Sequence, residues 1–305
     1  KPKRVRRVKA PLAAGAQIFL NYDPEVLAER PIPAKLLADK SEYSVWVKPP
    51  GMLCQGSKWG DHTTIERWAA KALQPERSAF VVHRLDRMAA GIVILGHTRH
   101  AVKHLAKQFQ DRTIVKQYRV LVDQCPELEL PFVIDSELDG KSARTVIDSV
   151  APNTGLLPSI WLQDSPALRT KPYSYSELSL RIETGRKHQI RRHLKTLRHP
   201  IAGDTRYGDR HHNHWAQQHL ALKSLALRAM VLTLLHPVSG ERLCIRAGLN
   251  DDWAMLLQQL GWYGLLTQVS EFGGSPGTRR WSSKRTPKLE LLSTPSTGKS
   301  SDGVQ

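Results

Sequence analysis

Cysteine is scarce in this sequence. The chain has three, Cys54, Cys125 and Cys244, and they lie far apart. No two of them have the short spacing of zinc ligands, and an odd number does not point to a set of disulfides. This scarcity argues against a disulfide-rich secreted domain and fits the reducing environment of the cytoplasm.

Long apolar runs are also missing. The nearest approach, residues 221–235, is interrupted by Lys223 and Arg228, whereas a helix that spans a bilayer needs about 20 consecutive apolar residues. We therefore expect no membrane partner. Hydrophobic residues still fill 40% of the 305 positions, which is enough for the core of one large domain or two smaller ones.

Acidic residues are in short supply relative to basic ones. The 28 Asp and Glu face 45 Lys and Arg, which leaves a formal net charge of +17. Such an excess favours a polyanionic partner, either a nucleic acid or another anionic surface. The alternative is a basic protein that has no such partner.

The apolar residues that are present recur with the periods of short strands and amphipathic helices. Alternation predicts strands at the start of 41–53 and over 80–82, 92–95, 116–122 and 176–182. Apolar spacing predicts helices over 63–73, 100–110 and 187–198. Because strands and helices do not alternate strictly, we expect an α+β fold with a mixed, mostly antiparallel central sheet.

The stretch VVHRLDRMAAGIVIL, residues 81–95, has an unusual centre. Two apolar runs enclose HRLDR, in which Asp86 is the one carboxylate among potential cations. A carboxylate at the end of a strand, followed by small residues, can project into a cleft. The alternative is an aspartate that caps a loop, which is the more common role of a single Asp.

A second segment, ETGRKHQIRRHLKTLRHPIAGDTRYGD at 183–209, gathers cations around one predicted helix. They are Arg186, Lys187, His188, Arg191, Arg192, Lys195 and Arg198. Arg191, Lys195 and Arg198 share one face by helical spacing, and like charges at that spacing repel. A polyanion or a buried carboxylate would relieve the repulsion. The alternative is a solvated basic face.

Four motifs resemble those of the RluA-type RNA pseudouridine synthases. HRLDRMAAG is similar to the family's HRLD-x-x-(T/S)-(S/A)-G, VKPPGML to its V-(N/K)-KP-x-G-(M/L) strand and turn, and KQYRVLV to its K-x-Y-x-A-x-V strand. GRKHQIRRHL and HPIAGDTRYGD are similar to its GR-x-HQ(I/L)R-x-H and HPI-x-GD-x-x-YG segments. Because the motifs keep the family's order, the match is specific. The residues of these motifs are most similar to those of the tRNA pseudouridine synthase C branch.

The resemblance implies a pseudouridine synthase fold and isomerisation of uridine to pseudouridine in RNA, without a metal or cofactor. It implies Asp86 as nucleophile, kept charged by Arg191, and Arg84 as the residue that fills the RNA stack when the target base turns out. Tyr118 is implied to stack on the uracil, and its hydroxyl is a candidate acceptor for the C5 proton. Without the resemblance, Tyr118 is interpreted as a core residue.

Substrate contacts are expected near the same helix. Phosphates would be bound by Arg186, Lys187, Arg192 and Lys195, and His188 would act as a hydrogen-bonding group. The expected partner is a structured RNA, tRNA in preference to ribosomal RNA, and the expected state is a monomer.

The resemblance also divides the chain. Residues 1–30 form a basic arm whose first part looks like the end of an S4-type RNA-binding module. Residues 38–265 are the expected catalytic domain, and 266–305, rich in Ser, Thr, Pro and Gly, are an expected disordered tail. One departure from the family is the pair Ala89 and Ala90, which stands where Thr and Ser are usual.

Two rival functions remain open. An RNA-binding protein that has lost catalysis would fit the Ala89–Ala90 departure, but it would not need Asp86, Tyr118 and Arg191 together. A metal-dependent phosphodiesterase would use ligands from GDTRYGDRHHNHW, although adjacent histidines in a loop are more often solvated. Those ligands would be Asp204, Asp209, His211, His212 and His214.

Overall fold

The computed structural model describes residues 11–19, 23–56, 62–124, 126–152, 174–220, 222–248, 251–260 and 262. The first ten residues of the expected basic arm, Cys125 and the whole expected tail at 266–305 lie outside these ranges. None of the helices within them is long and apolar enough to cross a membrane.

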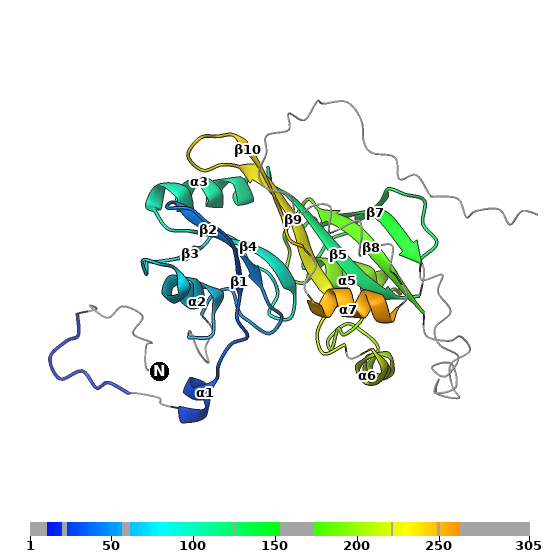
Figure 1. Cartoon of the computed structure of the whole chain (residues 1–305), viewed down its shortest axis with the longest axis horizontal. Helices are drawn as coiled ribbons and strands as arrows, with labels where there is room; N and C mark the ends of the chain where they lie inside the picture. Colours follow the sequence, from blue (N-terminus) through cyan, green and yellow to red (C-terminus); the bar gives the residue numbers. More distant parts are fainter. Residues whose placement is uncertain are drawn as a thin grey trace, which may run out of the picture. The chain divides into compact units, whose positions relative to one another are not determined.

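One mixed sheet organises the described part of the chain (Figure 1). Its strands are β1 (Lys35–Asp39), β2 (Tyr43–Lys48), β3 (Phe80–Val81), β4 (Ala90–Gly96), β5 (Val115–Asp123), β6 (Phe132–Asp135), β7 (Arg144–Pro152), β8 (Tyr175–Ile182), β9 (Leu227–Leu235) and β10 (Arg242–Arg246). They follow the order β1-β2-β4-β9-β5-β8-β7-β6, with β3 on β4 and β10 on β9. Only β4 and β9 pair in parallel among the described strands. The predicted α+β fold with a mostly antiparallel sheet is confirmed.

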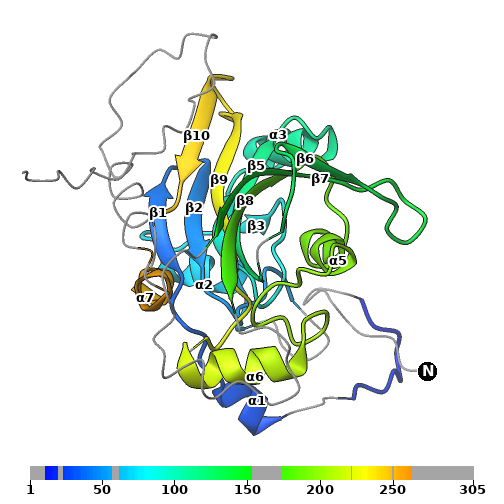
Figure 2. The same cartoon turned by 90° about the vertical axis from the view of Figure 1, so that its right-hand side faces the viewer.

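Helices cover both faces of this sheet. They are α1 (Pro24–Ala28), α2 (Ile65–Ala72), α3 (Arg99–Gln110), α5 (Gln189–Thr196), α6 (Arg210–His219) and α7 (Asp251–Gln259). Helices α2 and α3 lie on opposite sides of β2 and β4 (Figure 1), and α5 lies beside β7 and β8 (Figure 2).

Strand β4 is apolar along its length because both of its faces are covered. Val93 and Leu95 pack in the core under α2. Ile92 and Ile94 point to the other face, where they pack in the core that contains Leu105 of α3. Since successive side chains of a strand alternate between faces, a continuous apolar run is typical of a strand buried on both sides.

A third core fixes α5 on the sheet. The predicted apolar stripe of this helix, Ile190, Leu194 and Leu197, packs there with Val120 of β5 and Leu178 of β8. The opposite face of α5 is thereby directed away from the core. The helix therefore presents its polar residues to the loops around it.

Helix α5 is shorter than the predicted 187–198. His188 precedes it with φ 54°, and Arg198 follows it with φ 65°. Both are left-handed backbone conformations, which cannot continue a right-handed helix. Lys187 and Arg198 therefore lie outside the helix, and the predicted face of Arg191, Lys195 and Arg198 is wrong for Arg198.

Strands β4 and β9 approach closely at one point. Ala90 and Gly91 pair there with Arg228 and Ala229. Gly91 has φ 119°, and a Cβ atom at this position would lie 2.2 Å from the Ala229 carbonyl oxygen, so only glycine permits the contact. Ala229 also pairs with Tyr118 of β5. The crossing therefore brings the loop before β4 within one strand of Tyr118.

Candidate active site

Asp86 lies in the loop that connects β3 to β4. The N–H of Ala89 donates to the Asp86 carbonyl oxygen at 3.1 Å, which closes a turn just before β4 begins. The Asp86 side chain keeps 25% of its surface exposed. The carboxylate is therefore held on a short turn and remains accessible to a substrate.

The turn after β2 binds this loop. Lys48 is fully buried, and its Nζ donates to the carbonyl oxygens of Pro49 and Met52 at 2.8 Å and of Arg87 at 3.0 Å. The Gly51 N–H donates to the same Arg87 oxygen at 2.8 Å. Burial lowers the pKa of Lys48 to about 8, against the opposing effect of nearby negative groups.

A second contact holds the loop on the other side of the nucleophile candidate. The buried Cys54 Sγ accepts a hydrogen bond from the Leu85 N–H at 3.3 Å. Leu85 directly precedes Asp86, and Arg87 directly follows it. The backbone on both sides of Asp86 therefore has fixed partners in the segment from Lys48 to Cys54.

Arg191 of α5 reaches Asp86 from the far side of the site. Its Nη1 donates to Asp86 Oδ2 at 3.1 Å. Its Nε and Nη2 donate to the two carboxylate oxygens of Asp204 at 2.7 and 2.9 Å. Because a guanidinium presents its donors in a rigid planar fork, one arginine orients both carboxylates.

Asp204 is the buried member of this network, with 1% of its surface exposed. Burial acts to raise the pKa of Asp204, but hydrogen bonds from Arg191 and from the N–H groups of Tyr207 and Arg206 hold that pKa below its usual range. Burial also disfavours the charged form of Arg191, yet its two carboxylate partners raise the pKa of the guanidinium. The cation beside Asp86 is therefore permanent.

His188 and Tyr207 line the same side of the site. His188 Nδ1 lies 3.0 Å from the Tyr207 hydroxyl, and its Nε2 lies 4.0 Å from Asp86 Oδ1. Burial lowers the pKa of His188, although the charge of Asp86 opposes this shift. A neutral imidazole has one donor and one acceptor nitrogen, so His188 has the character of a hydrogen-bonding group.

Tyr118 is a buried residue of β5, and the predicted alternation of Tyr118, Val120 and Val122 on one buried face is confirmed. Burial and, to a smaller extent, the charge of Asp86 raise the pKa of Tyr118. The effect of Asp86 means that the two groups are electrostatic neighbours. The phenol therefore keeps its proton at neutral pH.

Three of the predicted substrate-binding residues are exposed. Arg84 lies in the loop between β3 and β4, two residues before Asp86. Lys187 lies just before α5, and Lys195 lies within that helix. The Lys195 ammonium lies 5.9 Å from the centre of the Tyr207 ring. Arg84 and Lys187 are thus close in sequence to Asp86 and His188, and Lys195 contacts the ring of Tyr207.

Two other predicted phosphate ligands have partners within the protein. Arg186 Nε donates to the Ser142 carbonyl oxygen at 2.9 Å. Arg192 donates through both Nη atoms to the Asp139 carboxylate, at 2.9 and 3.1 Å. Both contacts tie α5 and its approach to the loop between β6 and β7.

Three residues of this site were not predicted as such: Lys48, Asp204 and Tyr207. Lys48 fixes the loop, Asp204 orients Arg191, and Tyr207 contacts His188. All three stand inside VKPPGML and HPIAGDTRYGD, which carry the resemblance. That position is the signal that could have identified them.

The candidates for a metal site have other roles. Asp204 binds Arg191, and Asp209 Oδ1 caps α6 by accepting the His212 N–H at 2.7 Å. His212 Nε2 in turn lies 2.7 Å from the Tyr175 hydroxyl. No group of three or more His, Cys, Asp or Glu side chains in the described ranges could hold a metal ion. The phosphodiesterase alternative is not favoured.

Comparison with known proteins agrees with this geometry. The family described as RNA pseudouridylate synthase matches residues 42–196. The tRNA pseudouridine synthase C of Salmonella typhi is 37% identical over 193 residues, which cover 61% of this chain and 74% of that protein. The protein of the same name from Vibrio cholerae is 31% identical over 237 residues, 73% of this chain and 94% of that protein.

Solved structures show the same fold. Human RNA Pseudouridylate Synthase Domain Containing 4 matches with a TM-score of 0.55 at 21% identity, over 74% of this chain and 93% of that chain. Human RNA Pseudouridylate Synthase Domain Containing 1 matches with a TM-score of 0.56 at 17% identity, over 80% and 97%. By its sequence match and its relatives, this chain belongs to the RNA pseudouridylate synthase family.

Proposed function

We propose that this protein converts a specific uridine of tRNA into pseudouridine, with Asp86 as the nucleophile. The reaction breaks the bond between ribose C1′ and uracil N1 and forms a bond between C1′ and C5. C5 loses its proton, and N1 gains one. Since this is an isomerisation without a redox step, the site has to supply a nucleophile and a proton acceptor.

The observation that carries the proposal is the pairing of Asp86 with Arg191. A carboxylate nucleophile has to be ionised when the substrate closes the site. Arg191 supplies the opposing charge at 3.1 Å, and its other donors are occupied by the buried Asp204. Because the guanidinium is held by a second carboxylate, it need not move during the reaction.

Tyr118 and Arg84 are assigned the two remaining tasks. Asp86 in its charged form raises the pKa of Tyr118, and a covalent bond between Asp86 and the nucleotide removes that charge. With that charge removed, the Tyr118 hydroxyl more readily gives its own proton to uracil N1, and the phenolate oxygen then accepts the C5 proton. Arg84 is exposed two residues away and can fill the space left by the everted base.

Contacts to the RNA backbone are assigned to the cations around α5. Lys187 and Lys195 are exposed and available to phosphates. Arg186 and Arg192 would contact RNA from their present positions or exchange a protein partner for a phosphate. The Asp139 side chain is 71% exposed, so a phosphate competes with it for Arg192 at little cost.

The choice of tRNA is supported by the relatives, since curated proteins of 30–37% identity carry the name tRNA pseudouridine synthase C. The basic arm over 1–30, the catalytic domain over 38–265, the disordered tail over 266–305, the monomeric state and the cytoplasmic location stay predictions. Ribosomal RNA is the alternative substrate for the same chemistry.

The decisive experiment measures tritium released from RNA labelled at uridine C5. Bulk tRNA and ribosomal RNA from a strain that lacks this enzyme would be tested separately, with EDTA present. Asp86→Asn should release nothing and keep its affinity for RNA. Asp135→Asn is the matched control, because it alters the exposed Arg144–Asp135 pair, which has no role in the proposed chemistry, and it should keep activity.

Each outcome has one meaning. Release from tRNA alone, absent with Asp86→Asn, supports the proposal in full. Release from ribosomal RNA alone keeps the mechanism and overturns the choice of tRNA. Full activity of Asp86→Asn overturns its role as nucleophile. Normal RNA binding without release from either RNA favours a protein that has lost catalysis.

A further inference from the structure

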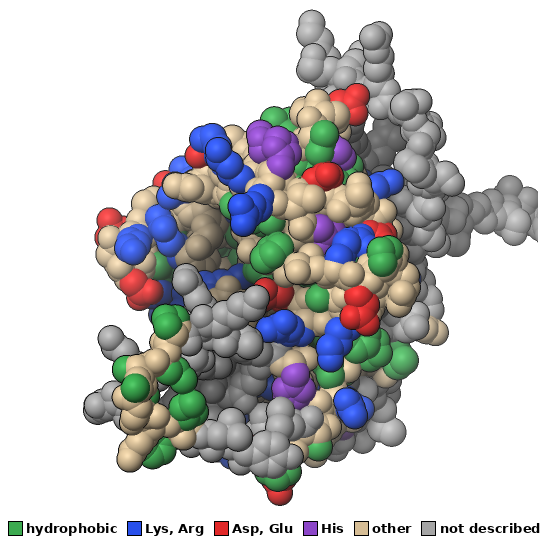
Figure 3. All heavy atoms as spheres, turned by 90° about the vertical axis from the view of Figure 1, so that its left-hand side faces the viewer, with side chains coloured by type: hydrophobic (Ala, Val, Ile, Leu, Met, Phe, Trp, Pro, Cys, Tyr) green, Lys and Arg blue, Asp and Glu red, His purple; other side chains and the backbone are tan. Residues whose placement is uncertain are grey.

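Helix α3 carries a cationic surface that the proposed chemistry does not use. Its exposed positions are Arg99, His100, Lys103, His104, Lys107 and Gln110. Apart from the glutamine, every one is basic or an imidazole. Lys, Arg and His side chains gather in the upper part of the face in Figure 3, the side of the molecule on which α3 lies in Figure 1.

Folding does not account for these charges. Arg99 and Lys103 occupy the first turns of α3, where the helix dipole disfavours cations. Lys103 also lies one turn from Arg99 and one turn from Lys107, and like charges at this spacing repel. A helix that only had to fold would be more stable with acidic or neutral residues at its start.

Neighbouring acids neutralise little of this surface. Lys107 pairs with Asp111 at 2.8 Å. Glu42, close to the start of the helix, accepts a hydrogen bond from Thr98. Within the described ranges, neither Arg99 nor Lys103 forms an ion pair. The cations of α5 differ, since Arg191 and Arg192 are held by carboxylates of the protein itself.

The position of α3 links this surface to the site. Near the end of the helix, the ring of Phe109 stacks on His83 at 4.4 Å, and His83 lies three residues before Asp86. From there, the 12 residues of α3 extend about 18 Å. A single nucleotide cannot reach from one end to the other, whereas a folded RNA can.

We infer that the exposed face of α3 binds the phosphate backbone of the substrate RNA, at a distance from the target uridine. Arg99, Lys103 and Lys107 recur at one-turn intervals and would each neutralise a phosphate. A polyanion on this face relieves the repulsion between them. The rings of His100 and His104, whose centres lie 4.3 Å apart, add hydrogen-bonding nitrogens beside the cations. The choice of RNA as partner rests on the proposed function.

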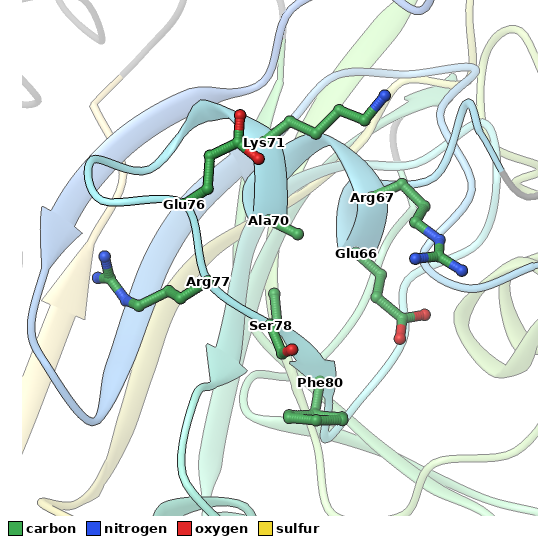
Figure 4. Close-up of a pocket in the computed structure, with 9 residues that line it drawn as sticks. Glu66, Arg67, Ala70, Lys71, Glu76, Arg77, Ser78 and Phe80 are labelled. Atoms are coloured by element: carbon green, nitrogen blue, oxygen red, sulfur yellow. The ribbon is translucent and has the colours of Figure 1, made fainter.

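The test compares two double variants of the full chain. Arg99→Gln with Lys103→Gln removes two cations of α3. Arg67→Gln with Lys71→Gln removes two exposed cations at the same spacing on α2. That second pair projects from α2 beside an open pocket that Glu66 and Glu76 also line (Figure 4), so carboxylates accompany these two cations.

The readout is filter binding to bulk tRNA from a strain that lacks the enzyme, from about 50 to about 200 mM KCl. The α3 variant should bind roughly tenfold more weakly at low salt. The slope of log Kd against log salt should fall by about one for each lost phosphate contact. The α2 variant should bind as the unchanged protein does. The charge-conserving double variant, Arg99→Lys with Lys103→Arg, should restore binding. The melting temperature of the α3 variant should not fall below that of the unchanged protein.

Three results would overturn the inference: tRNA binding unchanged in the α3 variant, an equal loss in the α2 variant, or failure of the charge-conserving variant to restore binding. Loss of binding to anionic phosphatidylglycerol vesicles with tRNA binding intact would assign the face to a membrane surface and also overturn it. Tritium release tests the proposed function separately. Without release, a specific loss of tRNA affinity in the α3 variant would still support this surface.

Discussion

Arg191 donates a hydrogen bond to Asp86 across 105 residues of sequence, at 3.1 Å. The loop before β4 presents the carboxylate, and the third residue of α5 presents the guanidinium. Because Nε and Nη2 of Arg191 both donate to Asp204, the position of Arg191 is set before any substrate arrives. The pair is thus preorganised rather than assembled by binding.

Replacing Arg191 by lysine should therefore impair catalysis strongly. A lysine keeps the charge but cannot bond both carboxylates in one plane, so we expect kcat to fall by roughly 100-fold or more while RNA affinity changes little. Tritium release under single-turnover conditions measures this. Arg144→Lys, which alters the exposed pair of Arg144 with Asp135, is the control and should keep kcat. Equal losses in the two variants would contradict the assignment.

Asp204→Asn tests the buried half of the same network. It leaves Arg191 with a weaker partner at the buried position of Asp204, and breaking a buried ion pair costs about 3–5 kcal/mol. We expect urea unfolding to show a loss of this order, whereas Asp139→Asn, at an exposed pair, should have a much smaller effect. A small effect in both variants would mean that Asp204 does not hold Arg191.

Tyr118→Phe separates the ring from the hydroxyl. If the hydroxyl accepts the C5 proton, its removal should lower kcat by roughly 100-fold to 10,000-fold and leave RNA binding nearly unchanged. Because the pKa of Tyr118 is raised above its ordinary value, the phenol does not lose its proton between about pH 7 and about pH 9. The activity of the unchanged protein should therefore show no step from Tyr118 in that range. Normal tritium release by Tyr118→Phe would remove the hydroxyl from the mechanism.

Apolar patterning predicted the strands that meet the core. Tyr118, Val120 and Val122 recur at every second position, and the strand they predict is present, with Leu121 between them also buried. The apolar run at 92–95 predicted a buried strand because both faces of β4 are covered. In these elements the side-chain pattern is a direct record of which face meets the core.

The sequence pattern did not show where the helices end or which charged residues pair. His188 and Arg198 stop α5 through left-handed backbone conformations, which a polar residue adopts without any periodic signature. The charge pattern could not distinguish α3 from α5 either, since both carry cations one turn apart. The difference comes from Asp139 and Asp204. These loop carboxylates lie 53 and 13 residues away in sequence and meet Arg192 and Arg191 only in the folded protein.

Lys48 predicts a pH dependence of stability. Its pKa is about 8 in the folded protein and has an ordinary value of 10.5, so between these values the unfolded chain binds more protons than the folded one. Stability due to this group therefore rises with pH through that window and is lost as pH falls toward 8. Relative to Lys48→Met, the free energy of unfolding should increase by about 2 kcal/mol from about pH 7.5 to about pH 9.5. Urea unfolding at both pH values measures it, and a constant difference would contradict the burial of the ammonium.

Gly91→Ala should damage both the fold and the site. A Cβ atom there lies 2.2 Å from the Ala229 carbonyl oxygen, and φ is 119°, so β4 and β9 have to separate just after the Asp86 loop. We expect a loss of more than about 3 kcal/mol in urea unfolding, together with loss of tritium release. Gly140→Ala is the control, since Gly140 has φ 68° with open space around it and should cost only about 1 kcal/mol. Equal costs would mean that backbone strain, rather than the close approach of the two strands, requires glycine at position 91.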